Sequence, residues 1–239
     1  MNFAGGRPVL VELVGTAGVG KTHLQGRLLG SLGSQAADPY SFRRSLTDPR
    51  SVVAAAARFA PMFVFMLRSS RHGWGQLLKY SATLFRYAFQ EERANRAPRQ
   101  PRVVVSGNGW YHKLRHVRRL VGKDLRFDDL PRRVRSELFR ASIVVHVTAD
   151  PMDVCARKLR RRGEDVTQSS LAAAYERAAE RGQWQEEEQS REDLEQAARS
   201  HGIEVIEIVY RDGYCVEREL MPTLIGLGIV AGGARSETA

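Results

Sequence analysis

The chain has 239 residues, of which 43% are hydrophobic, and a formal net charge of +10. This length supports one substantial core and is too short for two large domains. The two cysteines, Cys155 and Cys215, have no metal-type spacing. They argue against a disulfide framework and favour a reducing cytoplasm. Residues 1–8 lack the charged start, apolar stretch and cleavage site of a signal peptide.

The N-terminal part of the chain predicts a buried strand, a glycine-rich loop and a helix in direct succession. The run VLVELV at 9–14 is almost entirely apolar and ends at a glycine, as expected of a buried parallel strand. Residues 21–32 have apolar side chains at helical spacing, followed by a glycine. Residues 36–49 have the composition of a loop, residues 51–68 and 74–96 that of two helices, and residues 97–101 that of a proline-bounded linker.

The most apolar stretch of the chain is residues 52–67, which Arg58 and Pro61 interrupt. It is shorter than the roughly 20 residues that a membrane-spanning helix needs. We therefore expect a buried helix and no transmembrane segment. A surface that meets an apolar substrate or a lipid interface stays open as the alternative.

The remaining chain predicts further alternation of strands and helices. Strands are expected at 103–105, 143–147 and 203–209, and helices at 110–121, 131–140, from 151 onward, across 168–200 as one or two exposed helices, and at 216–225. Strands that alternate with helices imply a mostly parallel sheet with helices on both faces. The prediction is a three-layer α/β fold of about five strands, with one domain at 1–231 and a flexible tail at 232–239.

The loop after the first strand carries the strongest motif in the chain. Its sequence is Gly15-Thr16-Ala17-Gly18-Val19-Gly20-Lys21-Thr22, a full match to GxxxxGK[ST]. In such a loop the glycines let successive N–H groups point at phosphate oxygens, and the following helix adds its positive end. The lysine reaches the β and γ phosphates, and the threonine hydroxyl binds Mg²⁺. The motif predicts binding of ATP with Mg²⁺, with all eight residues contacting the nucleotide or metal.

Other classes of phosphate-loop protein lack support in the sequence. A GTPase needs a DxxG turn and an Asn-Lys-x-Asp reader of the base. No aspartate here is followed by glycine three residues later, and none of the three asparagines precedes a lysine. The serine-glycine-glycine signature of transporter ATPases is also missing from the chain.

The order of the remaining motifs resembles the thymidylate-kinase-like and deoxynucleoside-kinase-like superfamily of P-loop kinases. Asp38-Pro39 falls where those families place an acidic residue before a proline. The segment 143–163, IVVHVTADPMDVCARKLRRRG, resembles their strand, helix and arginine-rich lid. Residues 203–213 resemble the last strand and the turn near the adenine. The resemblance implies a P-loop NTPase fold with a lid at about 157–170.

The lid would place positive charge around the transferring phosphoryl group. Arg157, Arg161 and Arg162 fall where the lid arginines of the family lie. Phosphoryl transfer depends mainly on positioning and electrostatic stabilisation, so the resemblance implies catalytic roles for all three, and a nucleotide contact for Arg157. The structural alternative is a solvated basic helix end that suits the helix dipole.

The end of the second predicted strand departs from the family pattern. The family usually has an aspartate there, whereas this chain has Ser106-Gly107-Asn108. Asp38 is therefore the candidate base for the acceptor, with a turn-forming role as the alternative. Trp110 and His112 could equally line an acceptor pocket or belong to the core or surface.

These observations predict an ATP- and Mg²⁺-dependent cytoplasmic kinase that transfers the γ-phosphate to a nucleoside, nucleotide or sugar-like alcohol. The first alternative is a nucleotide-binding switch or accessory ATPase without transfer activity. The second is a nucleic-acid-end kinase or binder, because residues 86–162 hold 20 basic and 8 acidic side chains. Nucleic acid is not the favoured partner, since no aromatic-basic platform is visible. The sequence leaves open whether the protein forms a homodimer.

Overall fold

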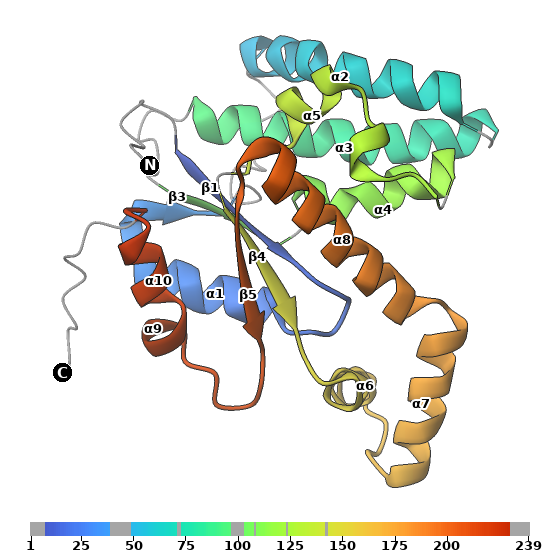
Figure 1. The fold of residues 1–239 in the computed structure, drawn as a ribbon, viewed down its shortest axis with the longest axis vertical. Helices are drawn as coiled ribbons and strands as arrows, with labels where there is room; N and C mark the ends of the chain where they lie inside the picture. Colours follow the sequence, from blue (N-terminus) through green and yellow to red (C-terminus); the bar gives the residue numbers. More distant parts are fainter. Residues whose placement is uncertain are drawn as a thin grey trace.

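The computed structural model describes residues 8–38, 49–70, 73–96, 103–107, 109–122, 124–141 and 143–229. Its centre is one sheet of five parallel strands in the order β2-β3-β1-β4-β5 (Figure 1). The strands are β1 Val9–Val14, β2 Ala36–Ala37, β3 Val103–Ser106, β4 Ile143–Thr148 and β5 Glu204–Val209. The predicted α/β class with a parallel central sheet of five strands is confirmed.

Helices cover both faces of this sheet. They are α1 Lys21–Leu32, α2 Pro49–Ser69, α3 Trp74–Asn95, α4 Trp110–Val121, α5 Arg132–Leu138, α6 Pro151–Arg161, α7 Gln168–Glu180, α8 Gln183–His201, α9 Val216–Glu219 and α10 Met221–Gly226. Two short 3₁₀ turns, η1 Gly33–Gln35 and η3 Phe127–Asp129, complete the described elements.

Two hydrophobic clusters explain the layers. Alternate residues of β1, β3 and β4, such as Leu13, Val105 and Val145, pack with α1, α9 and α10. On the other face, helices α2 to α5 and α8 pack around Val14 and Val144. Because successive strand side chains point to opposite faces, the continuous apolar runs of β1 and β4 supply both clusters.

A buried polar network ties the helices of the second face together. The guanidinium of Arg58 on α2 lies 2.6 Å from Glu91 on α3. Trp110 of α4 donates its indole N–H to the same carboxylate at 3.0 Å. The charge that interrupts the apolar stretch of residues 52–67 therefore lies inside the protein, and its partner is on a neighbouring helix.

Three sequence predictions need correction. Residues 36–49 are not all loop, because Ala36 and Ala37 pair with β3 as a short edge strand and α2 already begins at Pro49. Helix α2, expected to be a buried helix, exposes Val53, Val64 and Leu67 on its outer side. The one or two helices expected across 168–200 are two, as predicted, and they meet at Gly182, whose φ of 67° lies in the region favoured by glycine. The last predicted helix is two short helices separated at Leu220. The predicted linker at 97–101 and the tail at 232–239 lie outside the described residues.

Candidate phosphate and acceptor site

The glycine loop, residues 15–20, lies at the carboxyl end of the central strand β1. Strand β1 lies between β3 and β4. The helix that follows β1 packs on one face of the sheet, whereas the helix that follows β3 packs on the other. Ligands of parallel α/β sheets bind at this edge, where the connections diverge to opposite faces. The sheet order therefore puts the loop at the expected ligand position.

Backbone geometry explains the glycines of this loop. Gly15, Gly18 and Gly20 have φ values of 150°, 97° and 112°, which other residues adopt only with strain. A Cβ on Gly15 would lie 2.2 Å from the carbonyl oxygen of Val147 in β4. Close packing on β4 and the backbone torsions both require glycine here, and together they curl the loop tightly.

The side chain of Lys21, the first residue of α1, folds back into the glycine loop. Its Nζ donates hydrogen bonds to the carbonyl oxygens of Gly15 at 2.5 Å and Thr16 at 2.7 Å. Burial, together with the smaller effect of the nearby charge of Arg115, lowers the pKa of Lys21 from 10.5 to about 8. The hydrogen-bond acceptors of this buried cation are two carbonyl oxygens, and Glu187 is a nearby counter-charge. An anionic ligand would stabilise the cation further.

The N-terminus of α1 provides donors beside this lysine. Its N-cap, Gly20, makes no side-chain capping bond, and the first N–H groups of any helix lack a partner within the helix. Thr22 is exposed in the first turn. Among the residues that the structure describes, no group of three or more His, Cys, Asp or Glu side chains could hold a metal. One threonine hydroxyl fits Mg²⁺, which takes few protein ligands beside phosphate oxygens and water.

Arg157 of α6, for which the family resemblance implies a nucleotide contact, reaches the loop. One guanidinium nitrogen donates to the carbonyl oxygen of Val19 at 3.0 Å, and the other donates to that of Tyr210 at 3.4 Å. The guanidinium carbon also lies 5.1 Å from the centre of the Tyr210 ring. That ring covers Gly20, where an added Cβ would lie 2.6 Å from it. Arg157 and Tyr210 thus form one wall beside the start of α1.

The other two predicted lid arginines are more exposed. Arg161 ends α6, and its charge contributes to lowering the pKa of Lys21. Arg162 lies 3.7 Å from Glu164 in an exposed ion pair. Lys158, which the sequence analysis did not select, lies closer to the loop. A Cβ on Gly18 would lie 3.1 Å from its Cε.

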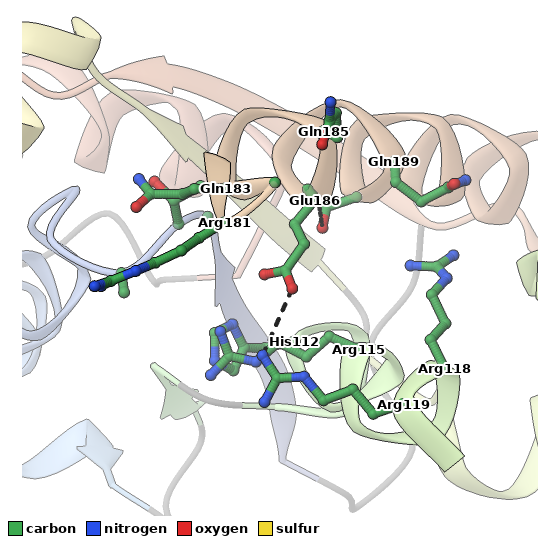
Figure 2. Close-up of a pocket in the computed structure, with 14 residues that line it drawn as sticks. His112, Arg115, Arg118, Arg119, Arg181, Gln183, Gln185, Glu186 and Gln189 are labelled. Carbon is green, nitrogen blue, oxygen red and sulfur yellow. Dashed lines mark hydrogen bonds and ion pairs between the residues drawn. The ribbon is translucent and has the colours of Figure 1, made fainter. Parts of the chain in front are cut away.

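A cavity of about 560 Å³ opens beside the first half of the loop. Figure 2 shows it between α4, which carries His112, Arg115, Arg118 and Arg119, and the start of α8. The remaining lining residues come from the loop, the α7–α8 turn and α8: Gly15, Thr16, Ala17, Arg181, Gly182, Gln183, Gln185, Glu186, Gln189 and Ser190. Its volume suits a small-molecule ligand.

A buried carboxylate fixes α4 next to this cavity. Glu12 of β1 accepts a hydrogen bond from the backbone N–H of His112 at 3.0 Å. Burial raises the pKa of Glu12, the N–H groups of α4 oppose the rise and Glu91 adds to it, and the resulting pKa is about 8. A Cβ on Gly109 would lie 2.1 Å from the Glu12 carboxyl carbon, so the close approach of strand and helix requires glycine.

The structure separates the two aromatic candidates that follow β3. Trp110 is 2% exposed and belongs to the core. His112 is also buried but lines the cavity. Burial, together with the smaller effects of the charges of Arg115 and Lys21, lowers its pKa to about 2. His112 is therefore neutral at physiological pH.

Asp38 follows the edge strand β2, with β3 between β2 and the central strand. Two strand spacings put the end of β2 about 10 Å from β1. Asp38 is partly exposed and does not line the cavity. At the end of β3, Ser106 is buried and bonded to the hydroxyl of Tyr87 at 3.2 Å. Asn108 and Pro39 lie outside the described residues.

Several site residues escaped the sequence analysis: Glu12, Arg115, Lys158, Arg181, Glu187 and Tyr210. Burial raises the pKa of Glu187 on α8, whereas the side chain of Thr16 and the charges of Lys21 and Lys158 lower it. These residues come from three helices, a strand and two connecting segments, and match no local motif. The cationic middle third of the sequence was the only signal for Arg115 and Lys158.

Comparison of the chain with protein-family models gave no match. Comparison with curated proteins gave none either. The function has to be argued from the residues and geometry of the site.

Proposed function

We propose that this protein is an ATP- and Mg²⁺-dependent phosphotransferase acting on a small acceptor. The observation that carries the proposal is the complete GxxxxGK[ST] loop at the end of the central strand, with Lys21 buried at an uncapped helix N-terminus and Arg157 on its rim. Backbone donors and the helix dipole favour phosphate at this place. A P-loop NTPase of the kinase type fits this arrangement.

The reaction is a transfer of the γ-phosphoryl group. An acceptor oxygen attacks the γ-phosphorus, the bond from that phosphorus to the β–γ bridging oxygen breaks, and ADP leaves. A hydroxyl acceptor gives its proton to a base, for which Asp38 is the candidate from the sequence, although it lies outside the cavity. Lys21 binds the β and γ phosphates, while Arg157, Arg161 and Arg162 neutralise charge in the transition state. The Thr22 hydroxyl would hold Mg²⁺, which would supply further neutralisation of phosphate charge.

The cavity beside the loop is the proposed acceptor site. It shares Gly15, Thr16 and Ala17 with the phosphate loop, so an acceptor bound there faces the triphosphate. Proximity of this kind supplies much of the rate enhancement in phosphoryl transfer.

Charge in this cavity favours an anionic acceptor, such as a nucleotide. Arg118 forms a buried ion pair with Asp193, and Arg119 lies 3.5 Å from Glu186 (Figure 2). Arg115 differs, because its Nε is buried with no hydrogen-bond partner among the described residues. Burial also lowers the pKa of Arg115. An anionic group of the acceptor would offset the cost of burying this guanidinium.

The test is acceptor-dependent ADP release, measured with nucleoside monophosphates and sugar phosphates against neutral nucleosides and sugars. We expect turnover with a phosphorylated acceptor, none for Lys21→Met, and an acceptor KM raised about tenfold or more for Arg115→Met. Arg133→Met, which changes an exposed arginine of α5, is the matched control.

Arg157→Met should lower kcat more than it weakens ATP binding. Equal turnover by the Lys21 variant would refute the phosphate site.

One observation favours a nucleotide-binding switch or accessory ATPase as the second candidate. The described end of β3 offers Ser106, which is bonded to Tyr87, where a carboxylate would assist transfer. ATP binding without ADP release across the acceptor panel would support this candidate over the kinase. Strongly salt-dependent binding of oligonucleotides would instead support the nucleic-acid alternative.

A further inference from the structure

Helix α2 has an inverted distribution of polar and apolar side chains. From residue 51 to 67 its polar side chains are Ser51 and Arg58, and both are buried. The exposed positions over the same span carry apolar side chains: Val53, Ala56, Ala57, Ala60, Val64 and Leu67. A surface helix normally presents polar residues to solvent. The outer face of α2 is therefore an apolar surface that lacks a partner among the described residues.

Helix α3 extends this surface at the turn that joins the two helices. Trp74 in its first turn is 67% exposed, and Leu78 one turn later is 57% exposed. Leu67 lies in the last full turn of α2, only seven residues before Trp74. In Figure 1, α2 and α3 run side by side, with α2 at the outer edge of the molecule and far from α9 and α10. We call this surface, formed by the exposed apolar residues of α2 with Trp74 and Leu78, the hairpin face.

The charges around the hairpin face are of one sign. Arg68, Lys79 and Arg86 are exposed on α2 and α3. Residues 49–90 contain neither Asp nor Glu. A second copy of this surface would bring basic residues against basic residues without a counter-charge. An anionic lipid surface supplies that counter-charge, and long basic side chains can keep their charged ends at the headgroups.

The helix also has features of a segment that lies along a membrane and does not cross it. By length and composition α2 could span a bilayer, yet a third of its apolar window is buried in the protein. Its inner side packs through Phe59, Met62 and Met66, and its Arg58 pairs with Glu91 on the neighbouring helix. A helix with one side committed to a protein core can insert its other side only to interfacial depth.

We propose that the hairpin face docks this protein onto an anionic membrane surface, with Trp74, Leu67 and Leu78 inserted at the headgroup boundary and Arg68, Lys79 and Arg86 contacting lipid phosphates. The proposal is independent of the phosphate site, because no residue of the hairpin face lines the loop or the cavity.

Vesicle flotation of the full chain tests this proposal. Phosphatidylcholine vesicles containing one third phosphatidylglycerol should bind the protein in about 0.1 M salt, and binding should weaken sharply in about 1 M salt. Phosphatidylcholine alone should bind at least tenfold more weakly. The emission of Trp74 should shift to the blue with the anionic vesicles, and the shift should disappear in Trp74→Phe.

Two variants separate the apolar and basic contributions. The triple variant Leu67→Gln, Trp74→Gln, Leu78→Gln changes only exposed side chains, so its thermal unfolding should match the parent while vesicle binding falls at least tenfold. Arg68→Gln, Lys79→Gln, Arg86→Gln should lose about 100-fold, since each basic residue near an anionic surface contributes about fivefold. Met152→Gln with Val209→Gln, exposed apolar residues of α6 and β5, is the matched control.

Two results would overturn the proposal. One is equal recovery of the parent and the triple glutamine variant with anionic vesicles, including no recovery of either. The other is a concentration-dependent dimer in analytical ultracentrifugation that the triple variant abolishes, with no vesicle binding by the parent. The hairpin face would then be a self-association surface.

Discussion

Replacing Lys21 by Met should make the protein without nucleotide more stable while removing its affinity for ATP. Lys21 is 9% exposed, and its pKa is lowered from 10.5 to about 8, mainly by burial. A folded-state pKa below the unfolded value means that the charged lysine opposes folding. The opposition is complete below about pH 8 and fades as pH rises toward 10.5. If the proposed phosphate site is correct, this cost to stability serves ligand binding.

The size of the effect follows from the shift. A lowering of this size corresponds to about 3 kcal/mol, at about 1.4 kcal/mol per pKa unit. Methionine removes that cost but also leaves the carbonyl oxygens of Gly15 and Thr16 without their donor, a loss of about 0.5–1.5 kcal/mol each. A net gain of up to about 2 kcal/mol remains, which raises Tm by up to about 8 °C in a domain of this size.

Thermal unfolding of parent and Lys21→Met at pH 7 and pH 10, without nucleotide, measures this gain. We expect a higher Tm for the variant at pH 7 and a much smaller difference at pH 10, where the lysine is neutral in the folded protein. Lys79→Met, the same change on the surface of α3, controls for the substitution itself. A variant less stable than the parent at pH 7, or a gain independent of pH, would refute the reasoning.

Three further predictions concern the surroundings of the loop. Gly20→Ala should destabilise the protein by about 1–3 kcal/mol in denaturant titrations and weaken ATP binding, because the new Cβ would lie 2.6 Å from Tyr210 and φ is 112°. The control is Gly26→Ala, in the open part of α1. In the same titrations it should be neutral or stabilise the protein by up to about 1 kcal/mol. Glu12→Gln should remove a pH dependence of unfolding. The raised pKa of about 8 means that the contribution of Glu12 to stability is highest below pH 4.5 and falls as pH rises to 8. The free energy of unfolding of the variant should therefore exceed that of the parent by about 2–4 kcal/mol at pH 9 and not at pH 4.5. Asp38→Asn should leave ATP affinity unchanged and lower transfer to hydroxyl acceptors about 100-fold, and unchanged turnover in the ADP-release assay would reduce Asp38 to a turn residue.

Local sequence patterns predicted most of the fold. The helix at 21–32 and the helix at 110–121 have the predicted bounds, because apolar periodicity and flanking glycines act within a few residues. The strands at 9–14 and 143–148 were found for a similar reason, since they are buried on both faces and almost wholly apolar. The edge strand Ala36–Ala37 was missed because two alanines carry no pattern, and only pairing with β3 makes them a strand.

The glycine loop could be recognised in the sequence because its residues are contiguous and local geometry requires each residue type at its position. Gly15 and Gly20 are required by the backbone torsions, and Lys21 by its place at the helix start. Arg157 could be selected through its place in the chain, whereas its contact with Val19 is visible only in three dimensions. Asp38 stays a prediction, since the structure places it at the same edge of the sheet but outside the cavity.

The sequence by itself determined the parallel α/β class and the tightly curled glycine loop after β1, because both depend on short-range periodicity and on the torsions of contiguous residues. Tertiary structure alone decided which charges meet. Arg115 becomes a cavity residue only because Glu12, about 100 positions earlier, fixes α4 beside the loop. The outer face of α2 became visible as an exposed surface only when packing showed that Arg58 points inward. Burial and long-range electrostatics depend on distances across the fold, which no local pattern encodes.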